Sequence, residues 1–176
     1  AGEVTLRAMF TPANLDNYAK VDEEVVLTIG RQTPVITWAT PEAITYGTPL
    51  GSNQLNAQAD VDGSFVYTPE VGEILGAGEE TLRVTFDPSN DNYAKVDAEV
   101  VLTINKAPLT VTAGNASRAY GEPNPDFDDL IRYDGFVNGE DENTEGVLTT
   151  PVSASTPAKP DSPPGEYPIV LSGGEA

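Results

Sequence analysis

AGEETLRVTFDPSNDNYAKVDAEVVLTI, residues 77–104, is the stretch from which the fold of this chain can be argued. A nearly identical stretch opens the chain, AGEVTLRAMFTPANLDNYAKVDEEVVLTI in residues 1–29. With Leu15 set aside as one extra residue, residues 1–30 and 77–105 are identical at 22 of 29 aligned positions. Self-similarity of this kind is the sequence signature of a repeat architecture. We therefore expect the chain to be built from repeated modules.

The duplicated stretch has the pattern of a β-hairpin. Leu82, Val84 and Phe86 alternate with polar residues, which places three apolar side chains on one face of a strand. A turn rich in Asx and Pro residues follows, and the alternation resumes over residues 99–104. The first copy keeps the pattern, so we expect both copies to bury this face. Its apolar positions in the first copy are Leu6, Ala8, Phe10, Val25, Leu27 and Ile29.

Composition narrows the class of protein. The 28 acidic and 9 basic residues give a net charge of −19, which repels a phosphate backbone and makes nucleic acid a poor partner. The absence of Cys and His removes disulfides, imidazole bases and the commonest zinc ligands. No apolar run is long enough for a membrane-spanning helix, so no membrane insertion is expected. The 16 Gly and 15 Pro, without helical periodicity, predict an all-β protein with many turns.

The chain divides into three parts. Residues 35–68 contain short strand patterns separated by turns, which together with the hairpin are typical of a β-sandwich. The opening of this part recurs 74 residues later, where Pro34 aligns with Pro108 and Tyr46 with Tyr120. We therefore predict the C-terminal hairpin of a partial Ig-like module in residues 1–30, a complete Ig-like β-sandwich in residues 31–105, and a β-sandwich lacking its final strand in residues 106–176.

Two stretches resemble known repeat families. ITWATPEAITYGTPL in residues 36–50 and GSFVYTP in residues 63–69 resemble Ig-like repeat modules of large bacterial surface and secreted proteins. The third part is similar to the YGX-type MBG domain of the same class of proteins, through LTVTAGNASRAYGEPNP (109–125), YDGFVNG (133–139) and GEYPI (165–169). The resemblance implies extracellular, secreted or cell-surface β-sandwiches in a stalk or adhesin. It supplies no catalytic residues.

These observations predict an all-β fold of tandem Ig-like antiparallel β-sandwich modules, joined by connectors of about four residues in a rod-like array. The expected function is structural and non-enzymatic: a stalk, spacer or filament unit of a bacterial surface protein. Its partners are then neighbouring repeats of the same or an identical chain. The alternative is an adhesin module that binds a glycan or a host surface protein through its loops. The aromatic residues that could stack on a glycan are Tyr18, Tyr93, Tyr120, Tyr133 and Phe136.

Acidic residues are the remaining candidates for site chemistry. The clusters at residues 126–129 and 140–142 lie on loops, whereas acid–base catalysis needs two carboxyl groups held about 5 to 9 Å apart over a substrate. Solvated loops are the simpler interpretation. Calcium is the only cofactor considered, with Asp87, Asn90 and Asp91 as candidate ligands. Their spacing matches no EF-hand loop, and an Asx turn is the competing interpretation.

The two outer parts predict a mode of assembly. The third module lacks a last strand, and residues 23–29 carry such a strand. Its donation from one molecule to the next would complete the acceptor module and build a fibre. The donor residues are Glu23, Val25, Leu27 and Ile29. The alternative, which we favour, is that these 176 residues are a window of a longer repeat protein.

Overall fold

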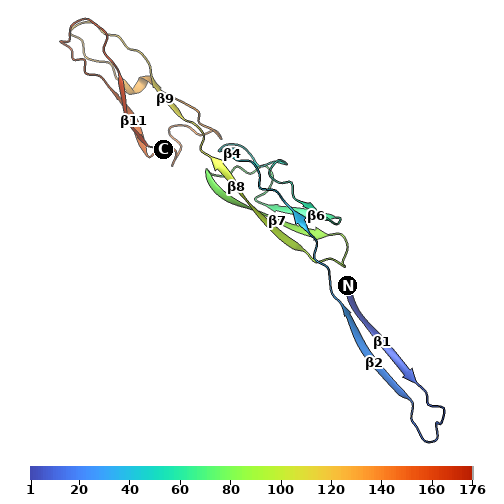
Figure 1. Ribbon diagram of the computed structural model, residues 1–176. Helices are drawn as coiled ribbons and strands as arrows, with labels where there is room; N and C mark the ends of the chain where they lie inside the picture. Colours follow the sequence, from blue (N-terminus) through green and yellow to red (C-terminus); the bar gives the residue numbers. More distant parts are fainter. Residues whose placement is uncertain (176) are drawn as a thin grey trace. The chain divides into compact units, whose positions relative to one another are not determined.

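The computed structural model describes residues 1–175 as β-strands, turns and one short 3₁₀ helix, η1 (Asp128–Leu130), which confirms the all-β class (Figure 1). The chain forms two compact units. The first contains Ala1–Ile44 and Pro49–Ile104, and the second contains Thr45–Thr48 and the chain from Asn105 onward. Within residues 1–175, no helix has the length and apolar character needed to cross a lipid bilayer.

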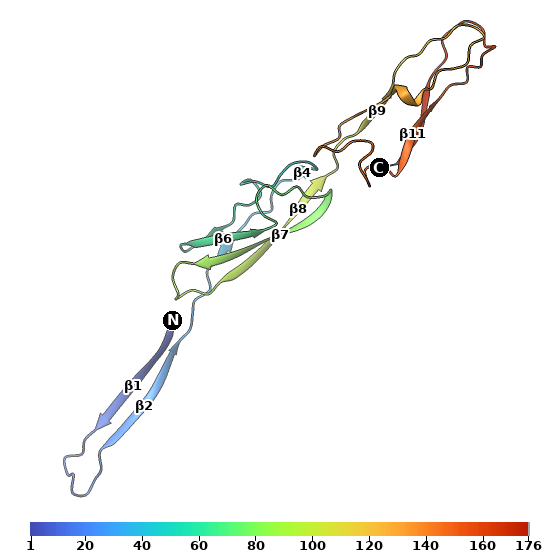
Figure 2. The ribbon, with the colours of Figure 1, turned by 180° about the vertical axis from the view of Figure 1, so that it is seen from behind.

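The first unit contains a hairpin and two further sheets. The hairpin strands are β1 (Gly2–Phe10) and β2 (Val21–Ile29), which pair antiparallel (Figure 2). A two-stranded sheet pairs β3 (Ile36–Thr37) with β5 (Gln58–Ala59). A four-stranded sheet has the order β4 (Ile44–Thr45), β8 (Val96–Asn105), β7 (Gly78–Pro88), β6 (Gly63–Thr68).

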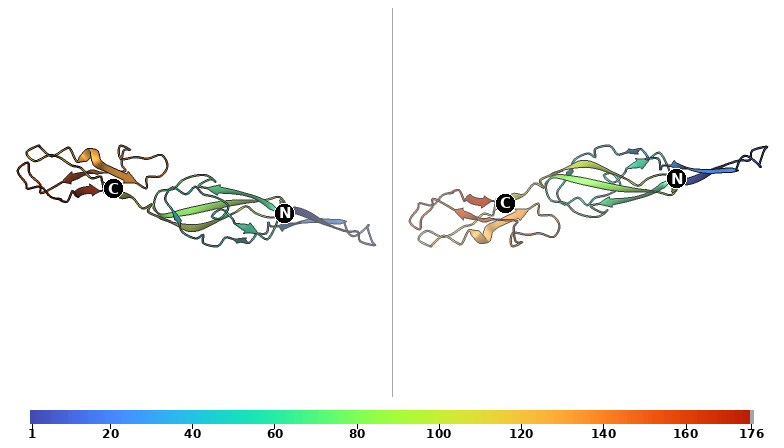
Figure 3. Two further views of the ribbon diagram at one scale, coloured as in Figure 1. Left: turned by 90° about the horizontal axis from the view of Figure 1, so that it is seen from above. Right: turned by 90° about the horizontal axis from the view of Figure 1, so that it is seen from below.

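The second unit contains two antiparallel strand pairs; in Figure 3 residues 131–134 are drawn in orange and residues 150–175 in red. One pair is β9 (Thr110–Ala113) with β10 (Ile131–Asp134), and the other is β11 (Thr150–Ser155) with β12 (Val170–Glu175). The 3₁₀ helix η1 leads directly into β10. In the described part of this unit, β12 pairs only with β11.

The core of the first unit lies on one face of β7 and β8. Leu82, Val84 and Phe86 of β7 are buried, as are Leu102 and Ile104 of β8. The alternating polar residues of both strands are mostly exposed. This confirms the inward face predicted for the second copy of the duplicated sequence. Alternation at a period of two, with one buried face, is what fixes the register of such a sheet.

Residues from the segment before β6 cover this face. Leu50 and Ala57 are buried with the side chain of Gln54. Trp38 lies edge-on against Tyr67 of β6, with ring centroids 5.5 Å apart, and its Nε1–H donates to the carbonyl of Gln54 at 3.0 Å. Burial raises the pKa of the Tyr67 hydroxyl. The only Trp of the chain is thus a packing residue that reports on this core.

The β1–β2 hairpin has the same register as the β7–β8 hairpin. Leu6 faces Val25 across the first hairpin, as Leu82 faces Val100 across the second. The extra residue Leu15 lies in the turn, outside both strands. The two copies of the sequence therefore form the same local structure.

The two hairpins differ in how far their apolar faces are covered. Leu6 is 50% exposed and its counterpart Leu82 is 0% exposed; Phe10 is 65% exposed and its counterpart Phe86 is 0% exposed. The expectation that both copies bury this face is therefore wrong for β1–β2. The physical reason is that strand alternation gathers apolar side chains on one side, but a second layer must remove them from water.

An ion pair links the two strands of the first hairpin on the opposite face. The Arg7 side chain donates from Nε to Oδ1 of Asp22 at 2.7 Å, and this hydrogen bond lowers the pKa of the Asp22 carboxyl. A carboxyl whose pKa is lower in the folded state stabilises the fold above its ordinary pKa of 3.8, and this contribution is lost as the pH falls through the lowered value. We expect Arg7→Gln to raise the pKa of Asp22 toward 3.8 in a titration followed by NMR. An Asp22 pKa that does not change on substitution would contradict the pairing.

Candidate functional site

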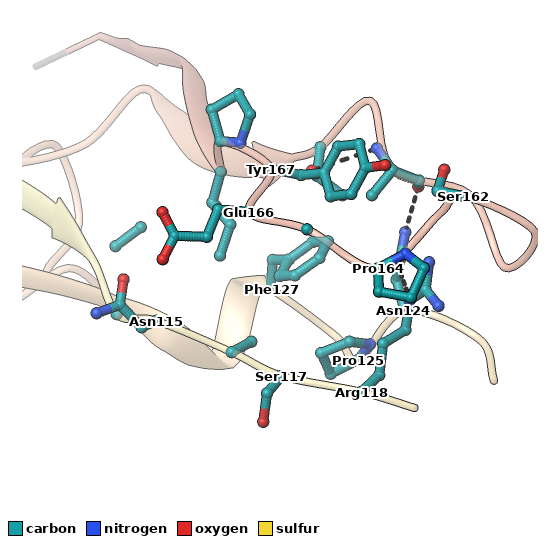
Figure 4. Close-up of a pocket in the computed structure, with 18 of the residues that line it drawn as sticks. Asn115, Ser117, Arg118, Asn124, Pro125, Phe127, Ser162, Pro164, Glu166 and Tyr167 are labelled. Atoms are coloured by element: carbon teal, nitrogen blue, oxygen red, sulfur yellow. Dashed lines mark hydrogen bonds between the residues drawn. The ribbon is translucent and has the colours of Figure 1, made fainter. Parts of the chain in front are cut away.

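A cleft of about 760 Å³ lies within the second unit. One wall is formed by residues 113–127, which follow β9, and the other by residues 156–169, which precede β12. These segments belong to connections between strands, and binding residues are often carried by such loops. Figure 4 shows Phe127 between the two walls, with Glu166 and Tyr167 on the opposite segment.

Arg118 holds the two walls together. Its Nε donates to Oδ1 of Asn124 at 2.7 Å on its own wall. Its guanidinium also donates to the carbonyl oxygens of Ala119 and, across the cleft, Lys159. A guanidinium presents five donors in a rigid fork, so it can satisfy several carbonyls at once. Arg118 is therefore a clamp between two loops about 40 residues apart in sequence.

Two further hydrogen bonds close the same end of the cleft. Asn124 Nδ2 donates to the carbonyl of Ala158 at 2.8 Å, and the backbone N–H of Gly121 donates to the carbonyl of Pro160 at 3.0 Å. On the second wall, the Tyr167 hydroxyl donates to the carbonyl of Pro163 at 3.0 Å. The polar groups at this end are thus occupied in holding the loops. The arrangement fixes the relative position of the two walls.

The cleft also carries aromatic rings that solvent can reach. Tyr120 is 69% exposed and Tyr167 is 40% exposed, while Phe127 is half-buried. Rings of this kind supply a large apolar face with a polar tip, which suits stacking on a ligand. Of the five aromatic residues considered from the sequence, only Tyr120 lines this cleft.

The other four aromatic residues lie elsewhere. Tyr18 is exposed in the turn between β1 and β2, and Tyr93 is half-buried before β8. Tyr133 and Phe136 are half-buried and pack against each other, with ring centroids 5.7 Å apart. The structure therefore does not bring the five rings together into one platform.

We expect Arg118→Ala to loosen residues 156–165. The change removes the cross-cleft hydrogen bond to Lys159 and the support of Asn124, so the amide of Gly121 loses protection from hydrogen exchange. Arg132→Ala is the matched control, because Arg132 donates only to nearby carbonyls, those of Asp129 and Ile131. Equal exchange of the Gly121 amide in the two variants would contradict the clamp.

A second, smaller groove of about 330 Å³ opens between the strand pairs of the second unit. Its lining is largely apolar. None of the described residues 105–174 reaches the burial of the first unit's core. The lining residues are Leu109, Val111, Tyr133, Leu148, Val152, Leu171, Gly173 and Gly174.

The candidate calcium ligands are engaged locally. Asp87 accepts an ion pair from Lys95, with Nζ 2.7 Å from Oδ2. Asn90 accepts the backbone N–H of Asn92 at 2.9 Å, which is an Asx turn, and Asp91 is exposed. Among residues 1–175, no group of three His, Cys, Asp or Glu side chains could hold a metal ion. Calcium at this turn stays a prediction.

Residues of the two acidic clusters accept hydrogen bonds from backbone N–H groups. Asp128 accepts the backbone N–H of Ala154 at 3.1 Å, and Asp141 accepts that of Asn143 at 2.9 Å. Within the second unit, Glu140 accepts the hydroxyl of Tyr46 at 2.6 Å. The strand-donation residues Glu23, Val25, Leu27 and Ile29 are exposed on β2 and face β1 residues over its whole length.

Comparison with known protein families gives one match, in the second unit. The geometry described above defines an all-β protein whose second unit has two strand pairs and a clamped cleft. Residues 109–176 match the family model of the MBG domain (YGX type), which confirms the resemblance expected for this part of the chain. The match covers 68 of the 176 residues, counted inclusively from 109 to 176. No curated protein and no solved structure matches the chain.

Proposed function

We propose that this chain is a non-catalytic structural segment, a stalk, spacer or filament unit, of a secreted or cell-surface bacterial protein. The family match over residues 109–176 supports a surface-protein repeat module. The observation that carries the proposal is the duplicated hairpin, because both copies form the same strand pairing in the same register. Repetition of one structural unit extends a protein without adding a new active site.

Tandem modules predict an elongated particle in solution. A compact globule of 176 residues has a radius of gyration of about 16 Å, whereas modules placed end to end exceed this value clearly. Small-angle X-ray scattering on the full chain measures the quantity directly. A radius of gyration near 16 Å with a compact distance distribution would contradict the proposal.

An adhesin is the second candidate, and the cleft of the second unit is the observation that favours it. Tyr120 and Tyr167 offer exposed rings beside a groove large enough for a small ligand. Binding on a glycan array that Tyr120→Ala abolishes would support this function. Tyr18→Ala is the matched control. The Tyr18 side chain is 66% exposed and that of Tyr120 is 69% exposed, but Tyr18 belongs to the first unit and does not line the cleft.

Strand donation is a route by which a filament of this protein could assemble. The apolar groove of the second unit is the acceptor, and β2 with Val25, Leu27 and Ile29 is the donor. Donation requires β2 to leave its pairing with β1. Light scattering at rising concentration tests it: Leu27→Asp should prevent oligomers that the unaltered chain forms, and a chain that stays monomeric would contradict it.

A further inference from the structure

The β1–β2 hairpin carries an apolar face, interrupted by Glu23 opposite Ala8, that nothing in the first unit covers. Val4, Leu6 and Phe10 of β1 share this face with Leu27 and Ile29 of β2, and each is 45% exposed or more. The strands are in full register, so these side chains form one surface and are not scattered. A contiguous exposed apolar patch on a soluble protein commonly marks an interaction site.

The duplicated hairpin shows what occupies the equivalent face. On β7–β8, residues 33–76 supply a strand on each side, β4 beside β8 and β6 beside β7, and also a cover. The Phe65 ring of β6 lies 4.8 Å from that of Phe86. The cover includes the buried Leu50 and Ala57. The β7–β8 hairpin therefore shows how the apolar face of this duplicated sequence is arranged when it is covered.

We propose that the β1–β2 face is a docking surface for a half-module of the type of residues 33–76, which covers the equivalent face of β7–β8. Such a half-module would pair a strand with β1, as β6 pairs with β7, and would cover the face beside it. The inference stands on the duplication alone and holds whether the chain acts as a spacer or as an adhesin.

A second copy of this chain is a poorer occupant. Its own residues 33–76 already cover β7 and β8, and moving them onto another molecule's hairpin would expose Leu82, Phe86 and Leu102, which are 0% exposed. Moving residues 33–76 in this way would cover the apolar face of β1–β2 in one molecule and expose the equivalent face of β7–β8 in the other. A separate half-module carries no such loss.

Three sequence differences refine the chemistry of the occupant. Val4 stands where the second hairpin has Glu80, which extends the apolar face toward Leu27. Ala8 faces Glu23, whereas the equivalent pair is Val84 and Ala98. The natural occupant should therefore place an apolar group near Val4 and a hydrogen-bond donor or cation near Glu23, since a covered carboxylate needs a partner.

The test adds a copy of residues 33–76 ahead of residue 1 of the full chain. Hydrogen exchange of the amides in residues 2–29 should slow by about tenfold or more relative to the unextended chain. The control carries Leu50→Asp and Ala57→Asp in the added copy only, and should leave the exchange fast. The same extension with Glu23→Ala removes the uncompensated carboxylate and should slow exchange at least as much.

Three results would overturn the proposal. The first is unchanged exchange of residues 2–29 in both the plain extension and its Glu23→Ala form. The second is equal slowing by the control extension, which would show that length and not packing is responsible. The third is slowing in the unextended chain as its concentration rises, with dimers in light scattering, which would assign the face to a second copy instead.

Discussion

Phe86→Ala lowers the free energy of unfolding of the first unit by about 3–5 kcal/mol, whereas Phe10→Ala, at the same place in the duplicated hairpin, changes it by less than about 0.5 kcal/mol. The two residues occupy the same aligned position in the duplicated sequence and the same strand register. They differ in burial, because Phe86 is 0% exposed and packs on Phe65, while Phe10 is 65% exposed. Removing a buried ring leaves a cavity, and removing an exposed ring does not.

Urea denaturation followed by the fluorescence of Trp38 measures both values, because Trp38 is the only Trp and lies in the core that Phe86 fills. Each substitution removes the same atoms, so Phe10→Ala controls for the change in composition. Equal costs at the two positions would show that the β1–β2 face is covered in the free chain.

The second large effect is expected in the second unit, where Gly135→Ala should cost about 3 kcal/mol or more. Gly135 has φ of +112°, and a Cβ there would lie 2.2 Å from the backbone oxygen of Pro108. A backbone atom next to β9 cannot move aside without disturbing the β9–β10 pairing. The substitution therefore adds a collision to the strain of a left-handed conformation.

Gly121→Ala is the matched control for this effect. Gly121 also has a positive φ, +88°, but a Cβ at that position meets no atom within 4 Å. It should cost only the conformational strain, about 1–2 kcal/mol. Hydrogen exchange of the β9 and β10 amides, measured at increasing urea concentrations, reports the stability of the second unit. Similar losses in the two variants would contradict the close approach at Gly135.

The sequence predicts the buried face of β7 and β8 well because alternation is a local property. Leu82, Val84 and Phe86 are buried as expected, and so are Leu102 and Ile104. The same alternation cannot predict whether a face is covered, because coverage depends on another segment. Leu6 and Phe10 repeat the pattern and stay exposed for this reason.

The candidate cleft shows a different limit of sequence reasoning. Arg118 donates to the backbone carbonyls of Ala119 and Lys159. Every residue type has a backbone carbonyl, so the identity of these acceptors cannot be predicted from the sequence. The one available signal is a basic residue in a strongly acidic chain. Tyr167, Ile169 and Leu171 alternate with other residues, which is the pattern of a strand beginning near residue 167, but β12 begins at Val170. Pro168 interrupts it, because Pro lacks the N–H that a ladder needs.

The most direct test of the account is hydrogen exchange of the two hairpins within one sample of the full chain. The sequences of residues 1–30 and 77–105 are nearly the same, so intrinsic exchange rates nearly cancel in the comparison. Amides of β7 and β8 should exchange at least about a hundredfold more slowly than their counterparts in β1 and β2, since an uncovered two-stranded hairpin is only marginally stable. Equal protection of the two hairpins would contradict the claim that a covering layer decides whether this sequence is stable.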